Sequence, residues 1–353
     1  MTFKITHRSE SKLPSVDFNH LKFGDTFSDH QFELKYKSGE WLQGQIMPYG
    51  PIQLDPALSV LHYGQAVFEG MKAFRYKNGK INIFRIEKHY DRFVRSCQRM
   101  NIPIISSEIF AESIKQLVDI DRDFVPEDKF KSLYLRPFIF AADEFLGVRA
   151  AQNYRYMVIT GPVGNYYAEG IKPVRLTTFP NYVRAVKGGV GDAKVPGNYG
   201  ATMKANNEAM SAGYAQVLWL DAFEHKYVEE VGTSNIFFLI DDTIITPPLE
   251  GTILPGVTRD SVIHIAKSWG MDVQEKKISI DEVFQAHSNG KLKEIFATGT
   301  AAVVSPVGFI HHNGKNLDLK QDSMGPLAQN LYDPLTGIHH GEVEDPDNWC
   351  TLI

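Results

Sequence analysis

Cysteine is scarce in this 353-residue chain, which contains only Cys97 and Cys350. Two cysteines so far apart make neither a disulfide framework nor a Cys-x-x-Cys metal knuckle, and they fit a reducing compartment. Long hydrophobic runs are also missing, because no stretch approaches the roughly 18 consecutive apolar residues that a membrane span requires. The polar N-terminal sequence lacks the features of a signal or transit peptide. These absences favour a cytoplasmic protein without a membrane segment.

Charge of one sign is not concentrated anywhere in the sequence. The chain has 37 basic and 42 acidic residues, and its net charge of −5 is dispersed. Sequence-independent nucleic-acid binding needs a clustered basic surface, so no nucleic-acid partner is expected. The pairs His311-His312 and His339-His340 do not predict a metal site, because adjacent side chains of a strand point to opposite faces.

Familiar nucleotide-binding fingerprints are absent as well. The sequence has no Gly-Lys-Ser/Thr of a P-loop, no Gly-x-Gly-x-x-Gly and no internal repeat. What it does have is a 43% hydrophobic content, which is enough to bury a sizeable core. Its length suggests two domains.

Alternating strand and helix signals follow a polar, irregular segment of about 50 residues, which predicts only a surface extension or a wrapping arm. The Asn78-Gly79 pair predicts a hairpin over 73–84, and apolar residues at helical spacing predict a helix over 90–100. Further elements are predicted as helices at 109–120, 206–212 and 262–269, strands at 132–141, 154–160, 215–220 and 294–298, and hairpins over 234–245 and at Asn313-Gly314. This pattern is typical of the mixed α+β or α/β class.

A segment rich in glycine and tyrosine, residues 161–170, marks the expected domain boundary. We therefore expect an N-terminal α/β domain with its extension over 1–165, an interdomain loop over 166–180, and a C-terminal domain over 181–353.

Four segments of small residues in the second half carry the candidate chemistry. Residues 187–200 surround Lys194 with five glycines, which let a backbone approach a ligand closely. Glu229 and Glu230 stand where a loop enters an apolar strand, so a buried carboxylate there needs a cationic partner unless it is solvated. Residues 254–260 open a helix whose free N–H groups can bind an anion, and residues 297–302 offer hydroxyls after a strand.

Taken singly, the four segments are also consistent with a surface lysine, a solvated carboxylate, an ordinary helix cap and a plain turn, respectively. Together they provide an amine, an acid and two anion cradles. Pyridoxal phosphate requires this combination, since it needs an amine for an imine, an acid opposite the pyridine nitrogen and donors for its phosphate.

At these motifs the sequence resembles the branched-chain amino acid aminotransferases, which are fold-type IV pyridoxal-phosphate enzymes. The matching stretches lie in register between about residues 30 and 345: Leu61-His62-Tyr63, Phe68-Glu69-Gly70-Met71-Lys72-Ala73-Phe74, Tyr134-Leu135-Arg136-Pro137, Gly197-Asn198-Tyr199-Gly200, Glu230-Val231-Gly232-Thr233-Ser234-Asn235 and Leu254-Pro255-Gly256-Val257. The resemblance implies a two-domain fold with the cofactor between the domains, and a homodimer. It also implies reversible transfer of the amino group of leucine, isoleucine or valine to 2-oxoglutarate.

The resemblance further implies a role for each matching residue. Lys194 matches the catalytic lysine, which binds the cofactor covalently and moves the substrate proton. Cofactor contacts are implied for Arg92, Lys194, Tyr199, Glu230, Thr233, Val257, Thr258 and Thr300. Among these, Tyr199 matches the partner of the phenolic oxygen and Glu230 the partner of the ring nitrogen. Substrate contacts are implied for Tyr63, Phe68, Tyr134, Arg136, Thr300 and Ala301, and for Leu146 and Val148 on a loop that reaches the partner subunit's pocket.

Several alternatives stay open at this point. A D-amino acid aminotransferase or an aminodeoxychorismate lyase would share the fold, and a non-catalytic phosphate-binding protein would share the glycine loops. Arg136 is expected to pair with the γ-carboxylate of glutamate or 2-oxoglutarate, with a structural salt bridge as the alternative. Some relatives carry a Cys-x-x-Cys where this chain has Ala302 and Ser305, so thiol control by that motif is excluded.

Overall fold

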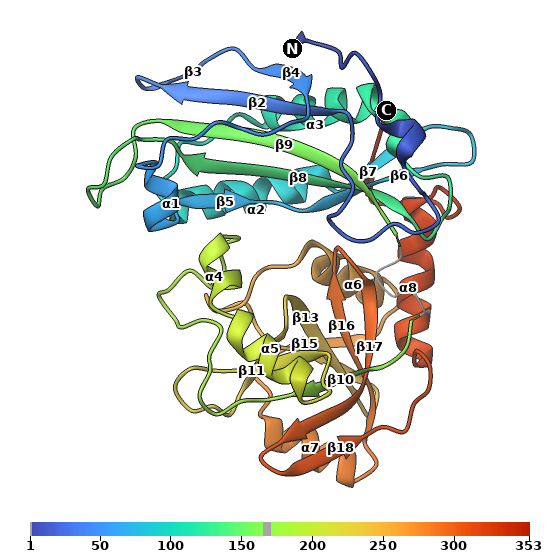
Figure 1. Ribbon diagram of the computed structural model, residues 1–353. Coiled ribbons are helices and arrows are strands. Elements are labelled where there is room, and N and C mark those ends of the chain that lie inside the picture. The colour runs from blue at the N-terminus through green and yellow to red at the C-terminus, as the bar shows by residue number, and fades with distance from the viewer. Residues whose placement is uncertain (1, 165–170) are drawn as a thin grey trace. The chain divides into compact units, whose positions relative to one another are not determined.

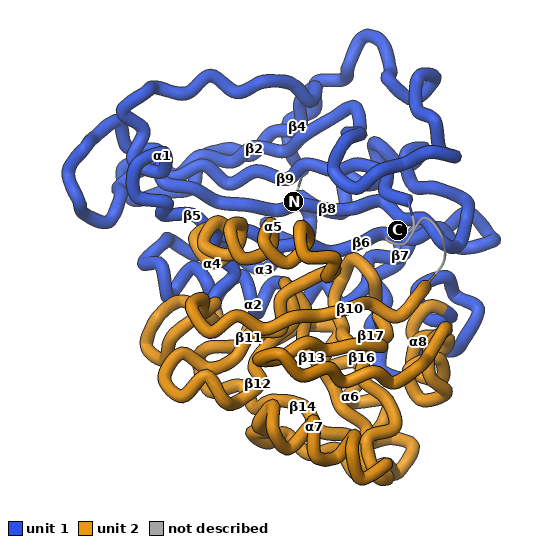
Figure 2. The backbone as a smooth tube through the Cα atoms, turned by 60° about the horizontal axis from the view of Figure 1, so that its bottom comes forward, with its two compact units in different colours: residues 1–166, 193–196, 337–353 blue, residues 167–192, 197–336 orange. Residues whose placement is uncertain are grey.

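The computed structural model describes residues 2–164 and 171–353. The chain divides into two compact units, which Figure 2 shows in separate colours. Unit 1 comprises residues 1–166, 193–196 and 337–353, and unit 2 comprises residues 167–192 and 197–336. Both units combine a sheet with helices, so the predicted mixed α/β class is confirmed.

Unit 1 is built on one sheet with the strand order β1-β4-β2-β9-β8-β6-β7-β19, in which β3 pairs with β2 and β5 pairs with β8 (Figure 1). Its strands are β1 (Lys4–Ile5), β2 (His30–Lys37), β3 (Glu40–Trp41), β4 (Gln45–Pro48), β5 (Ala66–Phe68), β6 (Met71–Arg75), β7 (Ile81–Phe84), β8 (Ser132–Ala141), β9 (Tyr154–Val163) and β19 (Cys350–Leu352). Its helices are α1 (Ser59–Tyr63), α2 (Ile86–Arg99) and α3 (Ser107–Ile120), with 3-10 turns at Leu13–Ser15 and Arg122–Phe124. Helix α3 contacts α2, β2 and β9, and Phe110 joins the rings of Phe93 and Tyr156 in this core.

The hairpin predicted at Asn78-Gly79 joins β6 to β7. The backbone N–H of Tyr76 donates to the carbonyl of Lys80 at 2.8 Å, and Gly79 has a φ of +82°, which glycine adopts without strain. The helix that follows, α2, buries Phe93 and Cys97 as its apolar spacing predicts. Arg92 also lies on this buried stripe, whereas Arg95 is exposed.

The first 50 residues are more ordered than predicted. Strand β2 lies between β4 and β9, and it buries Phe32 and Leu34. Its polar residues have partners far away in the sequence: His30 Nδ1 lies 2.6 Å from an oxygen of Asp121, and Arg155 Nε donates to Glu33 at 2.7 Å. The prediction of an irregular extension is wrong here, because such long-range pairs leave no trace in the local pattern.

Unit 2 contains a sheet with the strand order β12-β11-β10-β17-β16-β13-β14-β15, in which β18 pairs with β17. Its strands are β10 (Val174–Thr177), β11 (Gln216–Leu220), β12 (Val228–Val231), β13 (Ser234–Ile240), β14 (Thr243–Thr246), β15 (Asp272–Glu275), β16 (Leu292–Gly299), β17 (Val303–His312) and β18 (Lys315–Asp318). An additional pairing of β12 with β13 closes part of this sheet into a ring. The side chains of Leu218, Ile236 and Val307 are among those that fill its core.

The helices in the second half of the chain are α4 (Pro196–Gly200), α5 (Met203–Ser211), α6 (Val257–Ser268), α7 (Ile280–Ser288) and α8 (Pro326–His339). Two of them cross the unit boundary, because Pro196 of α4 and residues 337–339 of α8 belong to unit 1. Helices α6 and α7 contact β16, and α5 contacts β11. Across the described ranges, no helix is both long and apolar enough to cross a membrane.

The boundaries of the two units correct the sequence-based division in three places. The predicted interdomain loop 166–180 contains β10, which pairs in parallel with β11 and β17; residues 165–170 lie outside the described residues. Residues 337–353 were expected in the C-terminal domain, but β19 pairs with β7 in unit 1. Residues 193–196 also belong to unit 1. Composition cannot reveal these exchanges, because each depends on a partner strand or loop that is remote in the sequence.

Candidate active site

Lys194 is held in unit 1 by its own backbone. Its N–H donates to the hydroxyl of Ser96 at 2.9 Å, and its carbonyl accepts from the N–H of Phe68 at 3.1 Å. Desolvation of the ammonium group, together with the nearby positive charge of Arg92, lowers the pKa of Lys194 to about 8. A substantial share of this amine is therefore neutral near pH 8, and the neutral amine is the nucleophilic form.

The side chain of Arg92 is held in place by the buried carboxylate of Glu69. Glu69 lies in one of the matching sequence stretches, but the sequence analysis assigned it no role. The Nε and Nη2 atoms of Arg92 donate to the two oxygens of Glu69 at 2.7 and 2.8 Å, and Nδ1 of His89 lies 2.8 Å from the same carboxylate. Burial raises the pKa of Glu69, but Arg92 and His89 outweigh burial and hold that pKa far below its usual range. Glu69 therefore stays ionised and fixes the guanidinium in one orientation. His89 lies three residues before Arg92 on α2, a spacing that does place two side chains on one helix face.

Three of the predicted substrate residues gather on the sheet of unit 1. Nη2 of Arg136 donates to the hydroxyl of Tyr134 at 3.0 Å, and the guanidinium lies 4.9 Å from the centre of the Phe68 ring. The hydroxyl of Tyr134 sits where a Cβ on Gly70 would come within 2.0 Å, so only glycine leaves room for it. Among the described residues, the buried Nε of Arg136 has no hydrogen-bond partner. This orphaned donor fits a site that takes a ligand.

The sequence reasoning missed Phe23, which packs edge-on against Tyr134 with ring centres 4.8 Å apart. Phe23 lies in the segment predicted to be an extension, and no local signal singles it out. Gly161 in β9 and Gly164 just after it make room for this segment. A Cβ at Gly161 would lie 2.0 Å from the carbonyl oxygen of Thr26, and a Cβ at Gly164 would lie 2.5 Å from that of Leu21. The N-terminal segment is therefore built against the sheet that carries the predicted substrate residues.

The remaining predicted substrate residues of unit 1 form a second, exposed group. The hydroxyl of Tyr63 donates to the carbonyl of Leu146, which lies on the loop between β8 and β9. Leu146 and Val148 keep 59% and 85% of their surface exposed.

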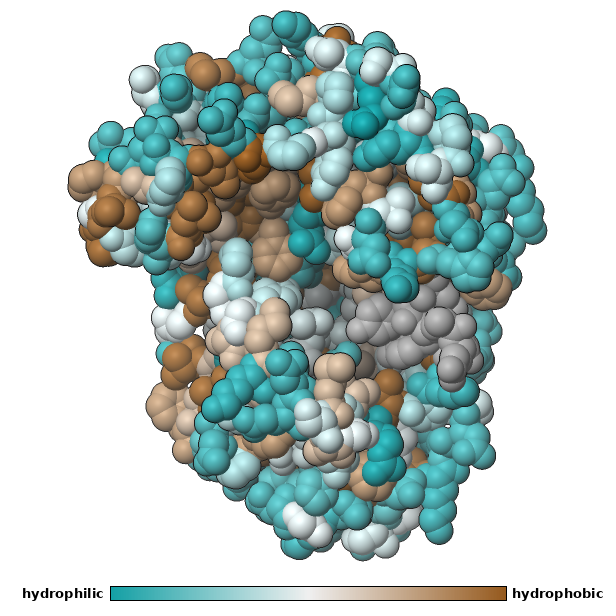
Figure 3. All heavy atoms as spheres, in the orientation of Figure 1, coloured by the Kyte–Doolittle hydropathy of each residue, from teal (hydrophilic) through white to brown (hydrophobic). Residues whose placement is uncertain are grey.

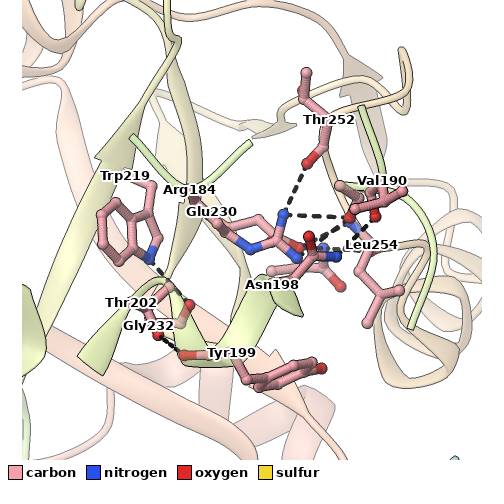
Figure 4. A network of polar contacts seen from close by, with 12 residues as sticks. Arg184, Val190, Asn198, Tyr199, Thr202, Trp219, Glu230, Gly232, Thr252 and Leu254 are labelled. Carbon is pink, nitrogen blue, oxygen red and sulfur yellow. Dashed lines mark hydrogen bonds and ion pairs between the residues drawn. The ribbon is translucent and has the colours of Figure 1, made fainter. Parts of the chain in front are cut away.

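In unit 2, Glu230 is buried and paired rather than solvated, and its cationic partner is Arg184. Nε of Arg184 lies 2.6 Å from Oε2 of Glu230, while Oε1 accepts from the backbone N–H of Leu254 at 3.0 Å. Arg184 also donates to the carbonyl of Thr252 at 2.8 Å, as Figure 4 shows. No sequence signal selects Arg184, since it lies 46 residues from Glu230 and outside every motif.

The neighbouring acid, Glu229, points to the other side of β12, as strand alternation predicts. It lines a cavity of about 150 Å³ together with Tyr227 and Thr252. Burial raises the pKa of Glu229. The two adjacent glutamates therefore have different surroundings, and only Glu230 has an arginine in direct contact.

Asn235 joins Glu230 to the start of α6. Its Nδ2 donates to Oε1 of Glu230 at 3.2 Å and to the carbonyl of Leu254 at 2.9 Å. A Cβ on Gly256 would lie 2.0 Å from Oδ1 of Asn235, so a glycine is required there. Gly256 provides no side-chain cap, which leaves the first N–H groups of α6, those of Val257 and Thr258, beside a positive helix end.

Strand pairing brings the last predicted segment of unit 2 next to this helix end. Glu230 pairs with Asn235 across β12 and β13, and Asn235 pairs with Thr298 across β13 and β16. Thr300 and Ala301 follow directly in the turn after β16. Thr233 lies in the turn between β12 and β13, whose Gly232 carbonyl accepts from the Trp219 indole at 3.0 Å.

Tyr199 belongs to the short helix α4, and its carbonyl accepts from the hydroxyl of Thr202 at 2.8 Å. Nδ2 of the preceding Asn198 donates to the carbonyl of Val190 at 2.7 Å. The second contact joins the residues that follow Lys194 to the glycine-rich loop that precedes it. The predicted site residues thus form two sets, one in each unit.

Neither histidine pair is part of these sets. His311 contacts Asn316 at 2.8 Å, and His312 contacts Thr178 at 2.8 Å. In the part of the chain that the structure describes, no group of three or more His, Cys, Asp or Glu side chains is placed to hold a metal ion.

Comparison with known proteins identifies the family. A model of the family "Amino-transferase class IV" matches residues 66–310. The chain is 48% identical to branched-chain-amino-acid aminotransferase 2 of Bacillus subtilis (strain 168), over 98% of this chain and 95% of that protein. It is also 48% identical to branched-chain-amino-acid transaminase 1 of the same strain, over 99% and 98% of the two chains.

Among solved structures, the fold is similar to that of the T.th. branched-chain amino acid aminotransferase crystallised with pyridoxamine 5′-phosphate. The TM-score is 0.74 at 30% identity, with 90% of this chain and 97% of that chain covered. The same enzyme was crystallised with N-(5′-phosphopyridoxyl)-L-glutamate and with 4-methylvaleric acid. The expectation of a fold-type IV architecture is confirmed by this similarity. The chain therefore belongs to the class IV aminotransferases and, within them, to the branched-chain-amino-acid aminotransferase family.

Proposed function

We propose that the protein is a pyridoxal-phosphate-dependent aminotransferase that exchanges amino groups between leucine, isoleucine or valine and 2-oxoglutarate. The observation that carries the proposal is Lys194, a lysine with a pKa lowered to about 8 that is fixed next to Phe68 and close to Arg92. An amine with this pKa is available in its neutral form at ordinary pH. Two relatives of this chain from Bacillus subtilis are named as branched-chain-amino-acid aminotransferase and transaminase, which also supports the proposal.

The residues present fit the cofactor. Lys194 would hold it covalently, and Arg92, Thr300 and the open N–H groups of Val257 and Thr258 supply donors for a dianionic phosphate. Glu230 would face the ring nitrogen, with Tyr199 and Thr233 as further contacts. When bound, pyridoxal phosphate supplies a carbonyl that accepts the amino group and a ring that delocalises the electrons left at the substrate Cα.

The protein's own contribution begins with a proton. Once the amine of Lys194 is free of the cofactor, its lowered pKa suits it to take a proton from the substrate Cα and to return it. Burial is the main cause of this low pKa, and Arg92, which Glu69 holds in place, lowers it further, whereas the negative charge of Glu69 partly opposes that effect. We infer that Lys194 is both the anchor and the base.

Arg136 is the residue we propose for accepting glutamate and 2-oxoglutarate in the same pocket as leucine. The structural salt bridge considered as its alternative role is not supported, because Arg136 has no ion pair within the described residues. It contacts the Phe68 ring and the Tyr134 hydroxyl instead, so its charge stays available while its plane lines an apolar wall. Tyr134 and the backbone of Thr300-Ala301 are proposed for the α-carboxylate.

We propose a homodimer as the functional form. Leu61, Phe145, Leu146 and Val148 are exposed in unit 1, and Figure 3 shows apolar side chains gathered over α1 and the loop between β8 and β9. Such a patch on a globular protein is typical of an interface.

A cytoplasmic location is also proposed, and it is supported by two cysteines that are both free thiols.

A substrate panel tests the proposed activity. Purified protein loaded with pyridoxal phosphate is assayed with L- and D-leucine, L-isoleucine, L-valine and L-aspartate, each against 2-oxoglutarate, by chromatography of the glutamate formed. We expect turnover with the three branched-chain L-amino acids and little with aspartate. Preference for D-leucine would instead support a D-amino acid aminotransferase. Cofactor binding without any transamination would contradict the proposal.

A further inference from the structure

The loop between β8 and β9, residues 142–153, is closed at its base by one carboxylate. Oδ1 of Asp143 accepts from the backbone N–H of Asn153 at 2.8 Å and from Nδ2 of the same residue at 2.9 Å. Both oxygens of Asp143 lie 3.1 Å from the N–H of Gln152, and Arg149 Nη2 lies 3.0 Å from Oδ2. Asp143 is buried, so its negative charge is directed at these donors rather than at solvent.

The protonation of Asp143 agrees with this arrangement. Burial raises its pKa, but hydrogen bonds from Gln152 and Asn153 and the charge of Arg149 outweigh burial and lower the pKa below its usual value. Asp143 is therefore ionised throughout the range in which an enzyme of this kind works, and charged hydrogen bonds are the strong ones.

The closed loop is also fastened to α1. The carbonyl of Asp143 accepts from the N–H of Ser59 at 2.8 Å, and the N–H of Phe145 donates to the carbonyl of Ala57 at 3.1 Å. At the end of α1, the hydroxyl of Tyr63 donates to the carbonyl of Leu146. Figure 1 shows the loop beside α1, so the two segments form one assembly.

The conformation of the loop tip is specific as well. The guanidinium of Arg149 lies 4.6 Å from the centre of the Phe145 ring, and a Cβ on Gly147 would come within 2.2 Å of that ring. Arg149 thus joins the tip to the carboxylate at the base. The position of the Leu146 carbonyl follows from the closure of the loop at both ends.

We propose that Asp143 is a positioning residue for Tyr63: by closing the loop it holds the Leu146 carbonyl where the Tyr63 hydroxyl can bind it, and so it fixes the Tyr63 ring for substrate binding. This inference rests on the proposed function, in which Tyr63 contacts the substrate. Asp143 itself touches neither substrate nor cofactor in this scheme. Its loss should therefore affect KM far more than kcat.

Steady-state kinetics of D143A, D143N and the control E144Q test the proposal. Glu144 is the adjacent carboxylate and is exposed. E144Q therefore removes one negative charge from the same loop but leaves the hydrogen bonds of Asp143 in place. We expect D143A to lower kcat/KM for leucine by about 10- to 100-fold, mainly through KM, because misplaced binding groups cost this much. D143N keeps an acceptor oxygen and should fall between D143A and wild type, while E144Q should match wild type.

A double-mutant cycle with Tyr63→Phe separates positioning from general structural damage. If Asp143 acts through Tyr63, D143A should cost much less in the Y63F background than in wild type. Independent, multiplicative losses would overturn the proposal, and so would a fall in kcat with an unchanged KM. If D143A does not fold, Asn153→Ala, which removes one donor to Asp143, takes its place in the cycle.

Hydrogen exchange supplies a readout that does not depend on the proposed activity. Peptides covering 143–153 should exchange faster in D143A, while those of β8 and β9 should not change. An inactive wild-type enzyme would refute the proposed function, whereas unchanged exchange of the loop in D143A would refute the role of Asp143.

Discussion

Unit 1 contains a second buried lysine, Lys72, and its comparison with Lys194 shows which surroundings distinguish the proposed catalytic amine. Burial also lowers the pKa of Lys72 to about 8, so a lowered pKa by itself does not select the nucleophile. The difference is in the nearby charge: burial alone lowers the pKa of Lys72, whereas burial and the positive charge of Arg92 together lower that of Lys194. Arg92 is also the arginine that we propose for the cofactor phosphate.

We therefore expect Lys194→Ala to keep the fold and to bind pyridoxal phosphate through the phosphate contacts, but to lose turnover completely. Lys72→Ala is the matched control. Borohydride reduction followed by mass spectrometry should place the cofactor on Lys194 in the control and on no residue of the Lys194 variant. Cofactor found on Lys72 would reverse the assignment. The rate at which wild-type apoprotein takes up cofactor should rise with pH through about 8, where half of the amine is neutral, and should level only at higher pH.

The contrast between Glu230 and Glu229 leads to opposite expectations for the same substitution. Glu230→Gln leaves Arg184 buried without its charge partner, so it should lower both turnover and the free energy of unfolding, the latter by about 3 kcal/mol. Glu229 has a raised pKa, which means that its ionisation destabilises the fold as pH rises through the carboxyl range. Glu229→Gln should therefore be neutral or stabilising at pH 7, with a difference from wild type that disappears in acid. Urea denaturation at pH 7 and pH 4, together with turnover assays, measures both effects. A greater loss in Glu229→Gln would contradict this assignment.

Arg136 allows a substrate-specific prediction. Arg136→Met keeps an apolar contact with the Phe68 ring but removes the charge. We expect kcat/KM for glutamate to fall roughly 30- to 1000-fold, which corresponds to a loss of about 2 to 4 kcal/mol of transition-state stabilisation. Leucine should be affected much less. Single half-reactions, followed through the absorbance of the cofactor, measure each amino acid separately. Parallel losses for both would remove the proposed role in dual recognition.

At the scale of elements, a carboxylate caps a helix from another part of the chain. Oε1 and Oε2 of Glu294, on β16, accept from the N–H groups of Leu327 and Ala328 in the first turn of α8 at 2.8 and 2.9 Å. A Cβ on Gly325 would lie 2.3 Å from this carboxylate, so the chain before the helix is shaped to receive it.

Removing this cap should destabilise the protein measurably. We expect Glu294→Ala to lower the free energy of unfolding by about 1 to 3 kcal/mol, since two charged hydrogen bonds in a buried site are lost. The adjacent and exposed Lys293→Ala is the control and should stay within about 0.5 kcal/mol of wild type. Equal effects of the two substitutions, measured by chemical denaturation, would show that the cap contributes little.

The elements that the sequence predicts well are those whose signal is local. Strand β8 has the predicted bounds, and the hairpins at Gly79 and Gly314 have the expected turns. Strand β2 escapes prediction because its buried polar residues bind Asp121 and Arg155 from other elements. The same reason explains the site: motifs reveal Lys194 and Glu230, whereas Arg184 and Phe23 are recognised only when the fold brings them to their partners.

At the scale of the whole molecule, the proposed homodimer makes the exposed loop tip an interface. Leu146→Asp combined with Val148→Asp should shift the protein to monomers in analytical ultracentrifugation, because two charges would be buried without partners. Phe223→Asp is a suitable control, since Phe223 is 78% exposed but lies in unit 2. A dimer that survives the first pair of changes and dissociates with the control would place the interface elsewhere.

The pairing of β19 with β7 has a consequence for how the chain is made. Strand β7 leaves the ribosome about 270 residues before its partner, so at roughly 5 to 20 residues per second the edge of unit 1 waits on the order of 15 to 50 seconds for its last strand. Lys194 reaches unit 1 during this interval, from a segment flanked on both sides by unit 2. A nascent chain that has completed β9 therefore carries Arg92, Tyr134 and Arg136 but not Lys194, the proposed nucleophile, which is added only after residues 167–192 of unit 2.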